Sequence, residues 1–172
     1  FCNSKNKIKD TISIFHKRQI KFVLCDCNIW QQLDPPSLAK IEDFFNSKNF
    51  TYSDRSLKVE GYSDYFIEEH NRIKTSTLRV NQLNEILNFN KNTRLLKIGC
   101  GTGSFLYKIK KITSFAEGID LSKKFSLFAK KNYGVKVTNA NYDKFSYVNK
   151  FDVILMFNVI ENLSNPKKTV QK

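Results

Sequence analysis

The sequence predicts an α/β fold in which a parallel sheet of about four strands is wrapped by helices. From residue 94 onwards, short apolar stretches alternate with longer stretches that are apolar on one helical face only. Strands joined by intervening helices pair in parallel, through right-handed crossovers. The last apolar stretch, 151–157, is apolar nearly throughout, as expected of a strand that is buried on both faces.

Residues 1–36 are expected to form a small β segment ahead of this sheet. The stretch 21–24 is β-prone, since it contains Phe22 and Val23. A turn at 34–37, which contains two adjacent prolines, ends the segment.

Residues 37–88 predict a helical lead-in. Ser37 is a suitable N-cap, and apolar residues recur at helical spacing over 38–45. Residues 46–63 show no clear period and predict a loop. One or two helices are expected to follow before residue 88.

Residues 89–172 contain the elements of the predicted sheet. Strands are expected at 95–98, 115–119, 135–137 and 151–157, and helices at 104–113, at 122–132 and from after Val159 to the end. The lysines of the first two helices lie away from the apolar face, so we expect them to face solvent.

The positive charge is concentrated in the second half of the chain. The net charge is +13, to which residues 1–74 contribute +2 and residues 75–172 contribute +11. A basic surface can bind nucleic acid, but such surfaces usually cluster on one face. Because most of these lysines belong to the outer sides of predicted helices, a solvated surface is favoured over a nucleic-acid interface.

The cysteines and the apolar runs predict a cytoplasmic protein that is not inserted in a membrane. The four cysteines, at positions 2, 25, 27 and 100, do not form a disulfide framework of the extracellular kind. No secretory pattern opens the sequence, and the longest apolar run is far short of the ~20 residues of a membrane helix. The chain begins at Phe1 without a methionine, and we expect it to be a fragment.

Glycines are concentrated between the first strand and its helix, at Gly99, Gly101 and Gly103. Glycines at such a junction permit positive φ and let the backbone approach a ligand, while the helix N-terminus offers unpaired N–H groups. Asp120 ends the next strand, 17 residues beyond Gly103. A carboxylate there can accept hydrogen bonds from both hydroxyls of a ribose, so the sequence predicts a nucleoside site.

The glycine spacing separates this loop from a dinucleotide fingerprint, which would need a glycine in place of Ser104. It resembles motif I of class I S-adenosylmethionine-dependent methyltransferases. Within that family the chain is most similar to the type 11/12-like group, which modifies sugars and polysaccharides in bacteria. The segments that carry the resemblance are LLKIGCGTG at 95–103, EGIDLS at 117–122, FDVI at 151–154 and VIENLSNP at 159–166.

The resemblance implies a Rossmann-like sheet and S-adenosylmethionine as the cofactor. The glycine loop would face the methionine part, Asp120 the ribose, and the segment at 140–141 the adenine. Phe157 and Asn158 would line the transfer site, and no catalytic residue is identified. The cofactor-binding residues implied in this way are Lys97, Gly99, Cys100, Gly101, Thr102, Gly103, Asp120, Leu121, Ala140, Asn141, Phe157 and Asn158.

Three features depart from the family pattern. Lys97 stands where motif I usually carries an acid, and it would repel the positive amino end of the cofactor. Asn162 replaces a histidine that is common in relatives that methylate hydroxyls, and an amide cannot act as a base. Only four of the family's seven strands fit into the chain. We therefore expect weak or absent activity from these residues alone.

The amino-terminal cysteines resemble part of a zinc knuckle that precedes the catalytic domain in some relatives. Four thiolates would hold zinc there, whereas the candidate ligands in this chain are Cys2, Cys25 and Cys27. We expect an incomplete site here and zinc, if any, in the full-length parent.

The lead-in helices of the same relatives lie over the cofactor site and help to choose the substrate. By this resemblance Tyr62, Tyr65 and His70 are candidate substrate contacts. The alternative is that the tyrosines pack in the interior and His70 is solvated.

Three functions are compatible with the sequence. The favoured one is methyl transfer to a small-molecule acceptor, a sugar or related metabolite. The second is methylation of RNA or protein, which would use the basic half of the chain. The third is a degenerate, non-catalytic binding module that has lost the cofactor because of Lys97 and the missing strands.

Overall fold

The computed structural model describes residues 7–15, 18–25, 27–33, 35–47, 66–148, 150–163 and 165–171. The chain divides into two compact units, one of Phe1–Leu38 with Ser164–Lys172 and one of Ala39–Leu163. None of the helices in the described ranges is long and apolar enough to cross a membrane.

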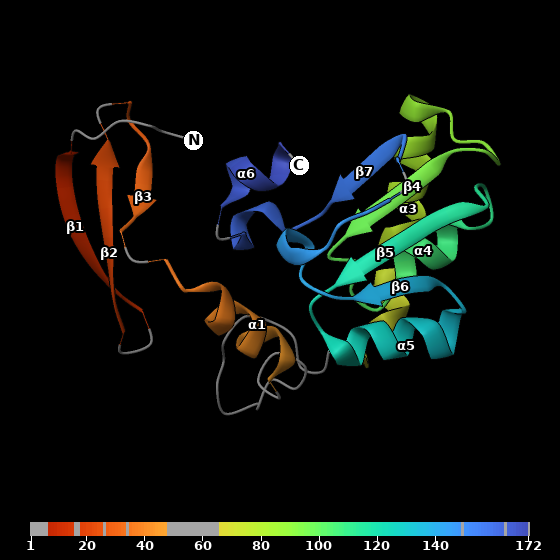
Figure 1. Cartoon of the computed structure of the whole chain (residues 1–172), viewed down its shortest axis with the longest axis horizontal. Helices are drawn as coiled ribbons and strands as arrows, with labels where there is room; N and C mark the ends of the chain where they lie inside the picture. Colours follow the sequence, from red (N-terminus) through yellow and green to blue (C-terminus); the bar gives the residue numbers. More distant parts are fainter. Residues whose placement is uncertain are drawn as a thin grey trace. The chain divides into compact units, whose positions relative to one another are not determined.

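The first unit contains an antiparallel sheet in the order β1-β2-β3. Its strands are β1 (Lys7–Phe15), β2 (Arg18–Cys25) and β3 (Trp30–Gln32), which follow one another as a meander (Figure 1). The β-prone stretch at 21–24 lies inside β2, as predicted. The sequence did not predict β1, because that stretch contains four charged or hydroxyl residues within its first five positions (KIKDT).

The second unit is built on a parallel sheet in the order β6-β5-β4-β7, which confirms the predicted fold class. The strands are β4 (Arg94–Ile98), β5 (Phe115–Asp120), β6 (Lys136–Asn139) and β7 (Val153–Met156). Because all four run in the same direction, their carboxyl ends lie at one edge of the sheet (Figure 1).

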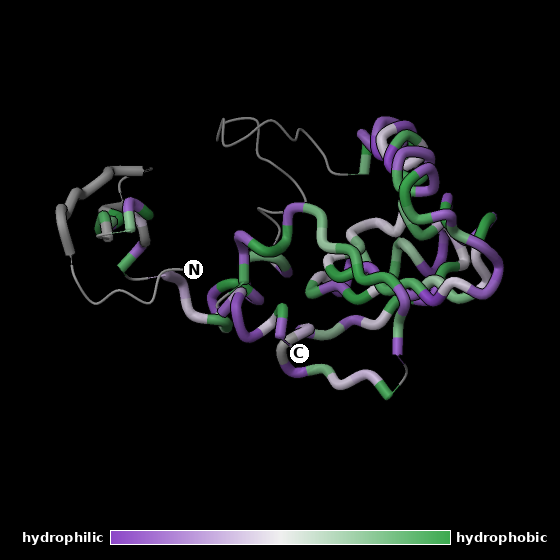
Figure 2. The backbone as a smooth tube through the Cα atoms, turned by 90° about the horizontal axis from the view of Figure 1, so that it is seen from above, coloured by the Kyte–Doolittle hydropathy of each residue, from purple (hydrophilic) through white to green (hydrophobic). Residues whose placement is uncertain are grey.

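The helices of this unit are α1 (Leu38–Asn46), α3 (Glu69–Leu87), α4 (Ser104–Ile109) and α5 (Lys123–Tyr133), with short 3-10 turns η1 (Tyr142–Lys144) and η2 (Ile160–Asn162). Hydrophilic and hydrophobic residues alternate along α3 in Figure 2, as in a helix with one buried side. The lysines in the last turn of α5, Lys130 and Lys131, are exposed as predicted.

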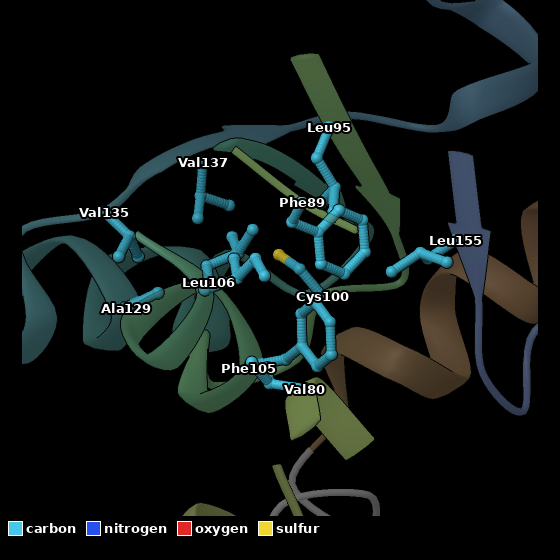
Figure 3. Packing of buried hydrophobic residues seen from close by; sticks show 11 residues of the cluster. Val80, Phe89, Leu95, Cys100, Phe105, Leu106, Ala129, Val135, Val137 and Leu155 are labelled. Atoms are coloured by element: carbon cyan, nitrogen blue, oxygen red, sulfur yellow. The ribbon is translucent and has the colours of Figure 1, made fainter. Parts of the chain in front are cut away.

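Different parts of the chain pack against the two faces of the sheet. On one face, Leu95 and Leu155 pack against Val80 of α3 and Leu106 of α4. Figure 3 shows the sulfur of Cys100 pointing into this cluster, between Leu106 and Phe89. On the opposite face, Leu96, Ile98 and Ile119 pack against Tyr142 and the chain that follows it. Successive residues of β4 thus point to opposite faces, which puts Lys97 on the side of α3.

Two predicted helices are shorter in the structure. The helix predicted over 104–113 ends at Ile109, where the backbone turns and both Ile112 and Thr113 donate to the carbonyl of Ile109. The helix predicted from Val159 to the end is wrong as one element. It is replaced by η2 and a separate α6 (Pro166–Val170), which falls in the first unit. Pro166 disfavours a helical conformation in the residue before it, so α6 starts anew at the Asn165 cap.

Candidate functional site

The glycine loop joins β4 to α4 at the carboxyl edge of the sheet. Gly99, Gly101 and Gly103 have φ values of +62°, +56° and +82°, which residues with a Cβ rarely adopt. Space is also lacking: a Cβ on Gly99 would lie 2.3 Å from Cγ2 of Val159, and one on Gly103 would lie 2.7 Å from Cβ of Ala129. The loop therefore needs glycine at 99 and 103 for conformation and for packing.

Asp120 connects this loop to the next strand. Its Oδ2 accepts a hydrogen bond of 2.7 Å from the backbone N–H of Gly101, and its Oδ1 accepts one of 2.8 Å from that of Ser122. Burial raises the pKa of the Asp120 carboxyl, while the two backbone hydrogen bonds act in the opposite direction. A carboxylate offers about four lone-pair sites, so acceptor capacity remains for hydroxyl groups of a ligand.

Lys97 lies beneath the same loop. The side chain is 5% exposed, and its Nζ donates a hydrogen bond of 2.9 Å to the carbonyl oxygen of Gly99. The Nζ also lies 4.9 Å from the ring centroid of Phe157, which follows β7. Burial lowers the pKa of Lys97 to about 8, because the charged form loses its hydration.

Arg79 reaches the Phe157 ring from α3, with its Cζ 4.8 Å from the centroid. Arg79 and Phe157 also line an open pocket on the surface, of about 460 Å³, together with Gln82, Leu83, Glu85 and Ile86. Sequence reasoning did not single out Arg79, since a lone arginine in an amphipathic helix normally faces solvent.

Glu69 anchors the start of α3 to the glycine loop. Its Oε1 accepts hydrogen bonds from Oγ1 of Thr102 (3.0 Å) and from Oη of Tyr133 (2.7 Å). Burial raises the pKa of the Glu69 carboxyl. A second link joins Ser76 and Ser104, whose hydroxyl oxygens are 3.0 Å apart. No signal in the sequence could have found these pairs, since their members are 28 or more residues apart.

Helix α1 contacts the chain that follows β5 and β6. Glu42 accepts a hydrogen bond of 2.8 Å from Nδ2 of Asn141 and one of 3.3 Å from Nζ of Lys144. The hydrogen bond from Asn141 is the main cause that lowers the pKa of Glu42. Asn46 donates to the carbonyl of Leu121 and accepts from the N–H of Lys123. Neither contact was predicted.

Most of the predicted cofactor residues come together at this edge. Lys97 lies inside β4, one residue before its end, and the loop 99–103 follows that strand. Asp120 ends β5, Leu121 follows it, and Ala140 donates its N–H to the carbonyl of Asp120. Phe157 and Asn158 follow β7, where Asn158 has a φ of +54°. Cys100 is buried, and burial raises the pKa of its thiol, so it is not a reactive thiolate.

The remaining predicted site residues are not brought to this edge by anything that the structure describes. Tyr62, Tyr65 and Cys2 lie outside the described residues, as does the side chain of Cys25. His70 is exposed in the first turn of α3, and Cys27 is exposed in the first unit. Within the described ranges no group of His, Cys, Asp and Glu could hold a metal ion, so the predicted zinc site has no support there.

Comparison with protein families gives one match. Residues 96–172 match the family Methyltransf_12, described as a methyltransferase domain. No curated protein matches the chain.

Several solved structures share the fold. One is magnesium protoporphyrin IX methyltransferase (ChlM) from Synechocystis PCC 6803 with bound SAM, at a TM-score of 0.57 and 17% identity, covering 81% of this chain and 71% of that one. A second is DesVI from Streptomyces venezuelae, at a TM-score of 0.51 and 18% identity, covering 65% and 52%. A third is YcgJ from Bacillus subtilis, at 0.50 and 18%, covering 57% and 44%. The match thus spans about half of the length of the last two.

Proposed function

We propose that this chain, whose residues 96–172 are part of a class I methyltransferase domain by ancestry, binds S-adenosylmethionine at the carboxyl edge of its parallel sheet and serves methyl transfer to a small-molecule acceptor. The observation that carries the proposal is the position of the Asp120 carboxylate. It is held between the glycine loop and the start of α5 by two backbone N–H groups, and its remaining lone pairs are suited to the hydroxyls of a ribose.

The residues at this edge fit the nucleoside part of the cofactor better than its charged end. Asp120 provides acceptors, and the positive φ values of the loop glycines allow the backbone to come close to a ligand. In this proposal Ala140 and Asn141 flank the adenine, and Leu121 follows the ribose. Lys97 opposes the fit, because a buried ammonium repels both the sulfonium and the amino group of S-adenosylmethionine.

S-adenosylmethionine would supply an activated methyl group, and the protein would supply alignment. Phe157 and Asn158, which follow β7, would border the acceptor. Phe157 is held by edge-to-face packing on Phe105, with ring centroids 5.5 Å apart. Asn162, in the exposed turn η2, donates to the carbonyl of Asn158 and as an amide takes up no proton.

The small-molecule acceptor is supported by the similar fold of magnesium protoporphyrin IX methyltransferase, whose name gives a porphyrin, a small molecule, as the acceptor. The burial of Lys97 favours a second candidate, a binding module without transferase activity. The two differ in the response to S-adenosylmethionine, which the second candidate does not bind until the charge of Lys97 is removed.

Isothermal titration calorimetry with S-adenosylhomocysteine tests the proposal. The wild-type chain is expected to bind, and Asp120→Asn to weaken binding at least about tenfold, since one of the two acceptor oxygens becomes an NH₂ group that faces a backbone N–H. Asp152→Asn is the matched control: its carboxylate also accepts from a backbone N–H, that of Arg94, at the opposite edge of the sheet. Absence of heat with the wild type, or equal affinity of Asp120→Asn, would refute the proposal.

A further inference from the structure

Lysines gather where α4 and α5 end. Residues 104–116 contain three lysines and residues 121–142 contain five, and neither stretch contains an aspartate or a glutamate. Both helices pack on the same face of the sheet, since Leu106 of α4 and Ala129 of α5 belong to one buried cluster. Five of the lysines stand in the last turns of the two helices or directly after them. They are called the lysine cluster below: Lys108, Lys110, Lys111, Lys130 and Lys131.

Three of these ammonium groups lie around one aromatic ring. The Nζ atoms of Lys108, Lys110 and Lys111 are 5.5, 5.2 and 6.0 Å from the ring centroid of Tyr107. Tyr107 stacks on Tyr133, with ring centroids 4.7 Å apart. The Nζ of Lys110 also donates to the carbonyl oxygen of Tyr133, the last residue of α5, which joins the ends of the two helices. The two half-buried rings and the lysines therefore form one surface.

The positive charge of the lysine cluster is not neutralised by neighbouring carboxylates. None of its five lysines forms an ion pair with a residue that the structure describes. Glu69 reaches the phenol of Tyr133, but its carboxylate is paired with Arg72 at 3.7 Å. Glu117, the first acid in the sequence after α4, is paired with Lys136 at 2.7 Å. The surface therefore keeps a local excess of positive charge, which attracts polyanions.

Interaction with the helix dipoles explains only part of this arrangement. Lys108, Lys130 and Lys131 stand in the last turns of their helices, where cations are stabilising. Lys110 and Lys111 lie beyond the end of α4 and are exposed. A helix dipole gives no reason for three ammonium groups to converge on one tyrosine, because at such distances they repel one another.

We propose that the lysine cluster and the stacked pair of Tyr107 and Tyr133 bind single-stranded nucleic acid. The long lysine side chains can turn from the ring to phosphates, and a base can stack on the tyrosine that they leave. A membrane surface fits less well, because an interfacial helix presents a row of apolar side chains to the lipid. Within α4 and α5, Leu127 alone is a large apolar side chain that is exposed.

This surface differs from the candidate cofactor site. Each of α4 and α5 leads from the carboxyl end of one strand to the start of the next, so its last turn lies toward the amino edge of the sheet. The glycine loop and Asp120 lie at the carboxyl edge. The proposal goes beyond the function proposed above and does not depend on it.

Fluorescence anisotropy of a labelled oligouridine of about 12 nucleotides, titrated with the 172-residue chain, tests the proposal. If each lysine of the cluster contacts a phosphate, a logarithmic plot of the association constant against salt concentration should have a slope of about −3.5. This corresponds to about a hundredfold loss of affinity between about 50 and about 200 mM salt. The double variant Lys130→Gln/Lys131→Gln should reduce the magnitude of the slope by about 1.4. Its matched control, Lys123→Gln/Lys124→Gln, removes two charges from the other end of the same helix and should leave the slope unchanged.

The tyrosine is tested separately from the charge. Tyr107→Leu should weaken binding at least about fivefold without a change in the slope, since it removes a stacking surface but no cation. Tyr107→Phe retains the ring and should bind like the wild type. Circular dichroism during thermal unfolding verifies that each variant is folded.

Four results would overturn the proposal. Equal losses in the two double-lysine variants would mean diffuse attraction by the net charge. Unchanged affinity of Tyr107→Leu would remove the stacking surface from the site. Tighter binding of an RNA duplex of the same length would show that the surface does not select single strands. Binding to phosphatidylserine vesicles without binding to the oligouridine would assign the lysine cluster to a lipid surface.

Discussion

Replacement of Gly99 by alanine should destabilise the second unit for two separable reasons. The residue has a φ of +62°, and the added Cβ would lie 2.3 Å from Cγ2 of Val159. The left-handed conformation costs a residue with a Cβ about 1–2 kcal/mol. Forcing a methyl group into occupied space adds about 1–3 kcal/mol. We therefore expect Gly99→Ala to lower the free energy of unfolding by about 2–5 kcal/mol.

Gly134 offers a matched control for the conformational part of this loss of stability. Its φ is +57°, but a Cβ built there has no neighbour within 4 Å. Gly134→Ala should therefore cost only about 1–2 kcal/mol. The difference between the two variants isolates the clash with Val159.

Urea unfolding followed by circular dichroism provides the measurement, with Val159→Ala as the third variant of a double-mutant cycle. Because Val159→Ala removes the methyl group that the Cβ added by Gly99→Ala would meet, the double variant should be more stable than the sum of the single effects predicts, by about 1–3 kcal/mol. A cost of Gly99→Ala no larger than that of Gly134→Ala, or strict additivity with Val159→Ala, would show that the packing around the loop is not as described.

Three further predictions concern single side chains. Since burial lowers the pKa of Lys97 from its ordinary 10.5 to about 8, the folded state releases this proton before the unfolded state does, and stability should rise with pH between these values. The free energy of unfolding of the wild type, measured relative to that of Lys97→Met, should therefore rise by on the order of 3 kcal/mol from pH 7 to pH 10. A stability difference between the two proteins that stays constant over this pH range would contradict the prediction. Ser122 caps α5, because its hydroxyl oxygen accepts a hydrogen bond of 3.4 Å from the N–H of Phe125. Ser122→Ala should therefore lower the free energy of unfolding in urea by about 1 kcal/mol. An unchanged free energy of unfolding would mean that the cap is not formed. Cys100 is buried and has a raised thiol pKa, whereas Cys27 is exposed. Brief alkylation in native buffer, followed by peptide mapping, should therefore find Cys27 modified and Cys100 protected. Rapid modification of both cysteines would argue against the buried position of Cys100 in the glycine loop.

The parallel sheet was predictable because its signals are local. Each strand is a short apolar run, and each crossover helix has one apolar side, so the alternation of β4, α4, β5 and α5 can be read from neighbouring residues. The terminal helix was the exception. The periodicity after Val159 continues through Pro166, and the proline divides it into η2 and α6.

The candidate site was predictable where backbone conformation or strand position demands a residue type. The loop glycines all have positive φ, and Asp120 stands at the end of a strand whose neighbours run in the same direction. The partners of these residues were not predictable. Glu69 holds Thr102, and Glu42 holds Asn141, across 33 and 99 residues of chain.

The sequence by itself therefore determined the sheet, the glycine loop and the carboxylate beside it, since periodicity and glycine placement constrain each short stretch directly. Only the tertiary structure decided what surrounds Lys97. The pattern of β4 puts its side chain on the same face as Leu95, but the packing of α3 and of the chain after β7 brings Arg79 and Phe157 to it. Contacts of this kind depend on how whole elements pack, and the period of one element does not encode the neighbour it will meet.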